Sequence, residues 1–122
     1  MQAIYRLKRR NDFKRVFRRG QSFANRQFVL YSCKRNTKGP FRIGISVSKK
    51  IGNAVVRNRL KRMIKEITRH WAGCIKKQID LVVIVRKPAA NMDYHQLKKS
   101  LRHLFNKSNV FEHLPPQNDK MR

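Results

Sequence analysis

The segment Ile79–Val85 places the strongest limit on the fold of this chain, because it is almost entirely apolar and rich in β-branched residues. Such a run is typical of a strand that is covered on both faces. Other elements must therefore pack against it. Pro88 follows shortly after and is expected to end this segment.

Two further strands are predicted upstream. Phe28–Lys34 is rich in β-branched and aromatic residues, and turn residues follow it at 36–40. In Phe41–Ser48, apolar residues alternate with four other residues. The alternation predicts one face in the core and a second face that is small, polar and open, formed by Arg42, Gly44, Ser46 and Ser48.

Two shorter helices are predicted near the ends of the chain. Asn11 and Asp12 resemble a helix start, and Gly20 ends a helix whose apolar residues, Phe13, Val16 and Phe17, recur at helical spacing. Towards the C-terminus, Asp93 is a candidate N-cap with Gln96 three residues later, the spacing of a capping box. The apolar stripe of that last helix comprises Tyr94, Leu97, Leu101, Leu104 and Phe105.

A long helix is expected over about 54–71. Its apolar residues share one arc, which we expect to pack on the sheet: Val56, Leu60, Met63, Ile64, Ile67 and Trp71. Basic and amide residues occupy most of the opposite side, with Arg59 further round, near Glu66. Within that side Arg57, Lys61, Lys65 and Arg69 recur at i+4 with no acid in the row, and like charges at this spacing repel.

These elements predict an α+β protein in the order α-β-β-α-β-α, a two-layer α/β sandwich with helices against one small sheet. The length fits one domain, which we place at residues 1–108. Residues 109–122 contain Pro115, Pro116 and polar residues, and are expected to form a flexible tail.

The charge balance predicts an anionic polymer as partner. Lys and Arg total 31 against 6 acidic residues, a formal charge of +25, at which a compact chain repels itself. No apolar run is long enough to span a membrane, and the N-terminus lacks the apolar region of a secretory signal. We therefore expect a cytoplasmic protein that binds nucleic acid rather than a membrane, with Cys33 and Cys74 as reduced thiols.

The basic row and the loop before it form a candidate phosphate-binding surface. Lys49 and Lys50 bring charge to the N-terminus of the long helix, where free N–H groups favour an anion. Gly52 allows close backbone approach, but the glycine spacing is not that of a Walker loop. An ordinary solvated helix face is the alternative, although such faces normally mix charges of both signs.

No catalytic constellation is visible in the sequence. A protein nuclease needs paired carboxylates for metal ions or a positioned acid–base pair. The six acids and four histidines are scattered along the chain, and His70 with Cys74 provides only two ligands of a zinc site. We predict no catalytic residues and no metal site in this chain.

The run 46–62, Ser-Val-Ser-Lys-Lys-Ile-Gly-Asn-Ala-Val-Val-Arg-Asn-Arg-Leu-Lys-Arg, resembles the signature of the bacterial ribonuclease P protein family. The similarity extends over most of the chain and includes Asp12-Phe13, Val16-Phe17, Ala24-Asn25-Arg26, Tyr31 and Asp80–Arg86. Val85 departs from the family, which often has alanine there, and nothing beyond Lys107 matches.

The resemblance implies a subunit of ribonuclease P, an endoribonuclease that removes the 5′ leader of precursor tRNA, with catalysis in the RNA subunit. It implies a left-handed β-α-β crossover, against the usual right-handed rule. It also implies a requirement of the RNA-containing enzyme for magnesium, and a monomer within a complex of one RNA and one protein. No cofactor bound by the protein itself is expected.

Two sets of site residues follow from the charge pattern and the resemblance together. The catalytic RNA is expected to contact the long helix and its preceding loop, at Lys49, Lys50, Asn53, Arg57, Asn58, Arg59, Lys61, Arg62, Lys65 and Arg69. The single-stranded leader of precursor tRNA needs stacking faces beside cations. A cleft between the first helix and the sheet is expected to supply them, at Phe13, Phe17, Tyr31, Ser46, Ser48, Arg86 and Lys87.

Alternatives remain at this stage. Spacing alone favours core packing for Phe13 and Phe17, whereas the hydroxyl of Tyr31 suits a partly hydrated site. Composition alone also fits a structural RNA-binding protein such as a ribosomal component, or a general nucleic-acid chaperone. The RNA that copurifies with the protein would distinguish these classes.

Overall fold

A computed structural model describes residues 5–116. Its elements follow the order α-β-β-β-α-β-α, with one more strand than the sequence analysis predicts. Their bounds are α1 Arg10–Arg19, β1 Gln21–Ala24, β2 Phe28–Lys34, β3 Arg42–Ser46, α2 Ala54–His70, β4 Ile79–Val85 and α3 Tyr94–Lys107. Short 3₁₀ turns lie at Ala72–Cys74 and Lys87–Ala89.

The four strands form one mixed sheet in the order β1-β2-β4-β3. β4 lies in the interior of the sheet, antiparallel to β2 and parallel to β3. This placement explains its apolar sequence, since it is covered on both faces as predicted. β1 was missed because it is only four residues long, mostly exposed and without apolar alternation.

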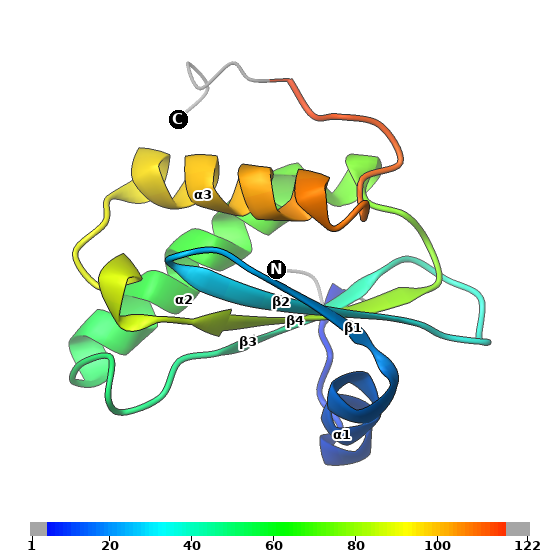
Figure 1. The fold of residues 1–122 in the computed structure, drawn as a ribbon, viewed down its shortest axis with the longest axis horizontal. Coiled ribbons are helices and arrows are strands. Elements are labelled where there is room, and N and C mark those ends of the chain that lie inside the picture. Colours follow the sequence, from blue (N-terminus) through cyan, green and yellow to red (C-terminus); the bar gives the residue numbers. More distant parts are fainter. Residues whose placement is uncertain (1–4, 117–122) are drawn as a thin grey trace.

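Helices cover both faces of the sheet, which corrects the predicted two-layer sandwich. Figure 1 shows α2 and α3 on one side and α1 on the other. The buried side chains divide accordingly into a large cluster beneath α2 and α3 and a small one beneath α1. The small cluster contains Leu7, Val16, Cys33 and Val82.

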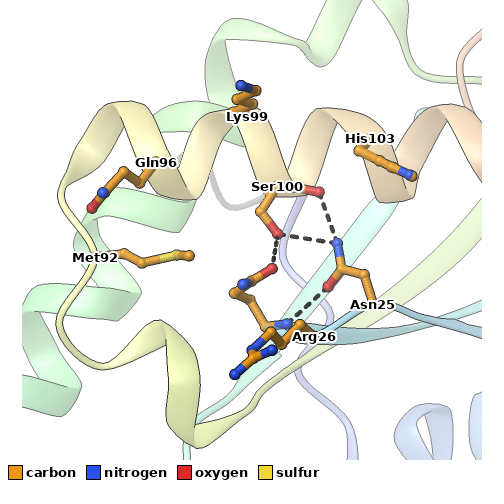
Figure 2. Close-up of a pocket in the computed structure, with 8 residues that line it drawn as sticks. Asn25, Arg26, Met92, Gln96, Lys99, Ser100 and His103 are labelled. Atoms are coloured by element: carbon orange, nitrogen blue, oxygen red, sulfur yellow. Dashed lines mark hydrogen bonds between the residues drawn. The ribbon is translucent and has the colours of Figure 1, made fainter.

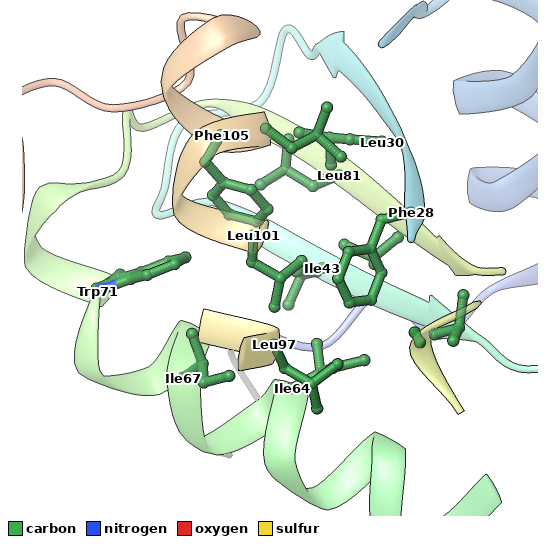
Figure 3. Close-up of a cluster of buried hydrophobic side chains, with 14 of the residues drawn as sticks. Phe28, Leu30, Ile43, Ile64, Ile67, Trp71, Leu81, Leu97, Leu101 and Phe105 are labelled. Carbon is green, nitrogen blue, oxygen red and sulfur yellow. The ribbon is translucent and has the colours of Figure 1, made fainter. Parts of the chain in front are cut away.

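The large cluster confirms the predicted stripes of the two long helices. In α2, Leu60, Ile64 and Ile67 are fully buried, and Trp71 lies just beyond the helix end. Figure 3 shows Ile64, Ile67 and Trp71 facing the side chains of α3 and the sheet, among them Leu97, Leu101 and Phe105 of α3. The packing fixes α2 so that the opposite side of the helix faces outward.

Capping residues set where both helices begin. The Asn53 side chain accepts a hydrogen bond from the Val56 N–H at 3.0 Å, which starts α2. Asp93 and Gln96 form the predicted capping box, with both bonds at 2.9 Å. Asn25 shapes the turn before β2 by accepting hydrogen bonds from the backbone of Gln27 and Phe28.

The packed domain extends beyond the predicted boundary at residue 108. Val110 and Phe111 are buried in the large cluster, and Phe111 forms an antiparallel bridge with Ile75. Phe111 also packs edge-on against Trp71, with ring centroids 5.3 Å apart. These residues therefore belong to the core and not to a tail. Part of the predicted tail, residues 117–122, lies outside the described residues.

Candidate RNA-binding surfaces

The outward side of α2 carries a concentrated set of cations. Lys61, Arg62 and Lys65 line a concavity of about 420 Å³ together with Val55 and Asn58. None of these three cations forms an ion pair with a residue of the described chain, 5–116. Such a row is destabilised by mutual repulsion until anions neutralise it, which makes it suited to phosphate groups.

Three of the predicted RNA-contacting residues on or before α2 use their side chains in hydrogen bonds to the protein backbone. Arg59 donates hydrogen bonds to the carbonyl oxygens of Ala90 at 2.6 Å and Met92 at 3.3 Å. It therefore ties α2 to the segment that precedes α3. Arg57 donates to the Gly52 carbonyl oxygen at 3.2 Å, and the Asn53 side chain caps the helix.

Arg69, the last cation of the basic row, has an acidic partner from outside that row. Its guanidinium lies 2.9 Å from a carboxylate oxygen of Glu66, one turn earlier in the helix, and this pair is substantially exposed. Exposed pairs of this kind contribute little to stability. The pairing nevertheless partly neutralises the charge of Arg69, whereas Lys61, Arg62 and Lys65 form no ion pair within residues 5–116.

On the other face of the sheet, α1 places two aromatic rings above the strands. The Phe17 ring meets Tyr31 of β2 edge-on, with centroids 5.0 Å apart, and Phe17 is 44% exposed. Phe17 is thus not a core residue, although its spacing in the sequence favoured core packing. The pair leaves aromatic surface accessible to a ligand.

Phe13 has a different environment. Its ring lies on Gly44 of β3 so closely that a Cβ atom at Gly44 would be 2.4 Å from Phe13 Cζ. Gly44 is consequently buried, and Arg42 on the same face is bound to acids, so only part of the predicted polar face of β3 is open. Phe13 also lines a pocket of about 160 Å³ whose lining includes Lys61 and Lys65. The pocket brings the two predicted sets of residues together at the β3 edge.

Beyond Phe13 and Phe17, a strip of the sheet remains accessible. Strand register places Ser46, Ile84 and Val29 side by side, and their side chains point to the same face as Tyr31. Ser46 is exposed, and Ile84 and Val29 are half-buried. We call Ser46, Ile84 and Val29, with the Phe17–Tyr31 pair, the α1-side strip.

Two cations, Arg86 and Lys87, directly follow the C-terminal end of β4. Arg86 donates to the Asn25 carbonyl oxygen at 2.9 Å. Lys87 donates to the carbonyl oxygens of Lys50 and Ile51 at 3.2 and 3.3 Å. Lys87 therefore connects the segment that follows β4 to the loop before α2, and Ser48 lies at the start of the same loop, where its carbonyl oxygen accepts from Ile51.

A buried ionic cluster anchors α1 to the sheet, and sequence reasoning missed it. Asp80 is completely buried in β4 and contacts three arginines, Arg15, Arg35 and Arg42. Asp12 of α1 joins through Arg15 at 2.9 Å and Arg42 at 3.8 Å. The signal in the sequence was the single acid within the apolar run Ile79–Val85.

The cluster is balanced almost to neutrality, with three arginines against two carboxylates. The hydrogen bond to Asp80 raises the pKa of Arg42 above its usual value. Because a raised pKa favours the folded state at all pH values below the unfolded pKa, this contribution is present throughout the physiological range. The two acids are thus neutralised by arginines.

Another concavity, of about 420 Å³, lies between the β1–β2 turn and α3 (Figure 2). Asn25 donates to the Ser100 carbonyl and hydroxyl oxygens at 3.1 and 3.0 Å, and the Ser100 hydroxyl donates to Gln27 at 2.9 Å. This network holds the turn against α3. None of the predicted site residues lines this concavity.

Within residues 5–116, no group of three or more His, Cys, Asp or Glu side chains is arranged to hold a metal ion. No helix in the same range is long and apolar enough to cross a membrane.

The fold and these surfaces define a small, strongly basic α+β protein that binds RNA. Comparison with known proteins agrees with this class and narrows it. The family model of ribonuclease P matches residues 1–109. The ribonuclease P protein component of Listeria monocytogenes is 51% identical over 115 residues, covering 94% of this chain and 97% of the relative. That of Bacillus pumilus is 47% identical with the same coverage.

Solved structures show the same likeness. The ribonuclease P protein of Staphylococcus aureus superposes with a TM-score of 0.84 at 45% identity, over 88% of this chain and 98% of that one. The ribonuclease P protein of Thermotoga maritima superposes with a TM-score of 0.76 at 37% identity, over 84% of this chain and 96% of that one. The chain belongs to the ribonuclease P protein family. It is a protein subunit of this endoribonuclease and assists processing of the 5′ leader of precursor tRNA, which implies association with ribonuclease P RNA.

Proposed function

We propose that the protein divides its two ligands between two surfaces that meet at the β3 edge. The outward side of α2, with the loop before it, binds the catalytic RNA, and the α1-side strip binds the precursor tRNA leader. The observation that carries this proposal is the accessible Phe17–Tyr31 pair beside an open strip of sheet. Single-stranded RNA offers base faces for such rings, whereas a paired stem hides them.

The cations support the same division. Lys61, Arg62 and Lys65 are free of ion pairs within the described chain and are the main candidates for contacts with the catalytic RNA. Lys49, Lys50, Asn58 and Arg69 extend this surface, whereas Arg57, Arg59 and Asn53 contribute mainly by holding it in place. Arg86, Lys87, Ser46 and Ser48 flank the leader path, and Phe13 forms its wall at Gly44.

The proposal includes several properties of the assembled enzyme. One protein monomer binds one catalytic RNA in the cytoplasm, and the RNA carries the catalysis. Magnesium is required by the RNA-containing enzyme, and the protein itself contributes no cofactor. We also propose that β3, α2 and β4 form a left-handed crossover, which the parallel pairing of β3 with β4 accommodates.

A reconstitution experiment tests this division of labour. Precursor tRNA is incubated with protein alone, with the catalytic RNA alone and with both, over a series of magnesium concentrations. We expect a single cut at the mature 5′ end only where the RNA is present. Because the +25 charge replaces counterions between two RNAs, the protein is expected to lower the magnesium requirement. Cleavage by rigorously RNA-free protein would contradict the proposal.

A further inference from the structure

A large cavity lies apart from both surfaces described above. Its volume is about 750 Å³, and it opens where α3 ends above the sheet. Its lining comes from the last residue of α1, from β1 and β2, from Lys76 and the first residue of β4, and from the C-terminal end of α3 with the residues that follow it. Phe23 and Ile79, which line it, pack against the large core beneath α2 and α3, whereas Arg19 and Cys33 line it from the α1 side. The groove shares no lining residue with the α1-side strip. We call it the α3-end groove.

Four cations from four separate segments surround the α3-end groove: Arg19, Lys34, Lys76 and Lys107. Within the described part of the chain, none of the residues that line the groove is acidic. No ion pair joins these four cations to any residue between 5 and 116. Cations that the fold gathers without counterions repel each other, and this cost is offset when a polyanion binds.

The groove also contains groups that could bind a nucleobase, namely an aromatic ring and polar side chains. Phe23 is half-buried, so its ring is held by the core but remains partly accessible. Ser32 and Asn109 provide polar side chains beside it. An aromatic face next to cations and small polar groups is the pattern that binds single-stranded RNA.

The backbone around the groove is also unusual. Among residues 5–116, only two non-glycine residues have positive φ: Gln78 at 58° and Asn109 at 61°. Asn109 lines the groove, and Gln78 lies between Lys76 and Ile79, which line it. Uncommon backbone conformations concentrate at functional sites. Here they turn the chain at the end of α3 and before β4, where Lys76 N–H donates to the Val110 carbonyl oxygen.

We propose that the α3-end groove is a second binding site for single-stranded RNA. The four cations contact successive phosphates, and a base stacks on Phe23. The volume falls within the range of about 300–1,000 Å³ that is typical of small-ligand sites, enough for a base with its sugar and phosphate. Two sources would supply the same chemistry: the distal part of a long leader, or an unpaired segment of the catalytic RNA.

The first test removes the charge of the groove with Lys34→Ala, Lys76→Ala and Lys107→Ala together. The matched control removes three exposed lysines that line neither the groove nor the proposed surfaces, with Lys8→Ala, Lys38→Ala and Lys99→Ala. Binding of a fluorescent oligouridylate is measured by anisotropy over a salt series. We expect the groove variant to lose about 0.7 log unit of salt slope per contact. The control should lose much less.

A second variant tests stacking without removing charge. Phe23→Leu keeps an apolar side chain against the core but removes the ring. Loss of one stacked base should weaken oligonucleotide binding by about tenfold, while thermal unfolding verifies that the variant folds. In the wild type, a thiouridine-containing oligonucleotide should photo-crosslink to the peptide that holds Phe23, and the groove variant should lose this crosslink.

The assembled enzyme distinguishes the two sources. Affinity is measured for precursor tRNA with a short and a long leader, and separately for the catalytic RNA. A loss confined to the long leader identifies the distal leader as the ligand, and a loss for the catalytic RNA identifies that RNA. If the groove variant and Phe23→Leu both match the control in every arm, the proposal is overturned. The α2 and α1-side surfaces are left intact in these variants, so their assignment is tested independently.

Discussion

The Phe13 ring lies directly on the backbone of Gly44, with room for no Cβ atom between them. This contact fixes the distance between α1 and the sheet, and with it the position of Phe17. The conformation of Gly44 is one that any residue can adopt, because its φ is not positive. The requirement for glycine is therefore steric and depends on one neighbouring ring.

Gly44→Ala should displace Phe13 and α1. We expect it to lower the free energy of unfolding by about 1–3 kcal/mol, as overpacking of a filled site does. It should also weaken leader-dependent binding of precursor tRNA. The control is Gly73→Ala, since a Cβ atom there meets nothing within 4 Å. Urea unfolding of both variants checks the prediction, and equal stabilities would show that α1 adjusts freely.

Asp80→Asn should destabilise the protein strongly. Asp80 is fully buried against three arginines, and removal of one partner from a buried ionic cluster costs about 3–5 kcal/mol. The matched control is Asp93→Asn, which keeps the α3 N-cap because Asn caps as well as Asp. Thermal and urea unfolding measure both variants. A stability of Asp80→Asn close to that of the control would contradict the anchoring role of the cluster.

Phe17→Ala and Tyr31→Ala should weaken capture of precursor tRNA and leave mature tRNA unaffected. Each base that stacks on an aromatic ring contributes about 1–3 kcal/mol, so the loss should be about tenfold to a hundredfold. The measurement is the affinity of the assembled RNA–protein enzyme for tRNA with and without its leader.

The exposure of Phe17 makes its variant the cleaner of the two. Because the Phe17 side chain is 44% exposed, its truncation should change the stability of the protein little. Tyr31 is half-buried, so its variant needs an unfolding control. If both variants fold and still favour leader-bearing tRNA as strongly as the wild type, the leader follows another path.

Lys61→Ala, Arg62→Ala and Lys65→Ala together should weaken binding to the catalytic RNA without unfolding the protein. Each lost phosphate contact should reduce the salt dependence of binding by somewhat under one log unit, about 0.7–0.9. Arg59→Ala provides the contrast. Arg59 bonds to the carbonyl oxygens of Ala90 and Met92. Its loss should therefore clearly lower the thermal stability of the protein and change the salt dependence of RNA binding only slightly. Filter binding and thermal unfolding separate the two effects.

The sequence was sufficient for the elements with strong periodicity. The stripe of α2, the capping box at Asp93 and the apolar strand β4 were all predicted correctly. Periodicity shows which side of a helix is buried but not which face of the sheet it covers. The apolar residues of α1 therefore gave no sign that this helix lies opposite α2 and α3.

The side-chain contacts that the sequence analysis did not predict share one cause. Helical periodicity places Arg59 on the side of α2, but only the tertiary structure brings the carbonyl oxygens of Ala90 and Met92 within its reach. Asp12 and Asp80 are far apart in sequence and share the partners Arg15 and Arg42 only because α1 packs on the sheet. Contacts over such separations leave no local pattern.

The interior position of β4 also has a consequence for synthesis of the chain. β2 and β3 do not pair with each other, and both pair with β4, which begins at Ile79. A growing chain can therefore form the β1–β2 hairpin early but cannot complete the sheet until residue 85 has left the ribosome. At about 5–20 residues per second, the strongly basic first half remains without its core for several seconds. Nascent chains consequently present unfolded cationic segments to the most abundant RNA nearby, which is the ribosome that makes them.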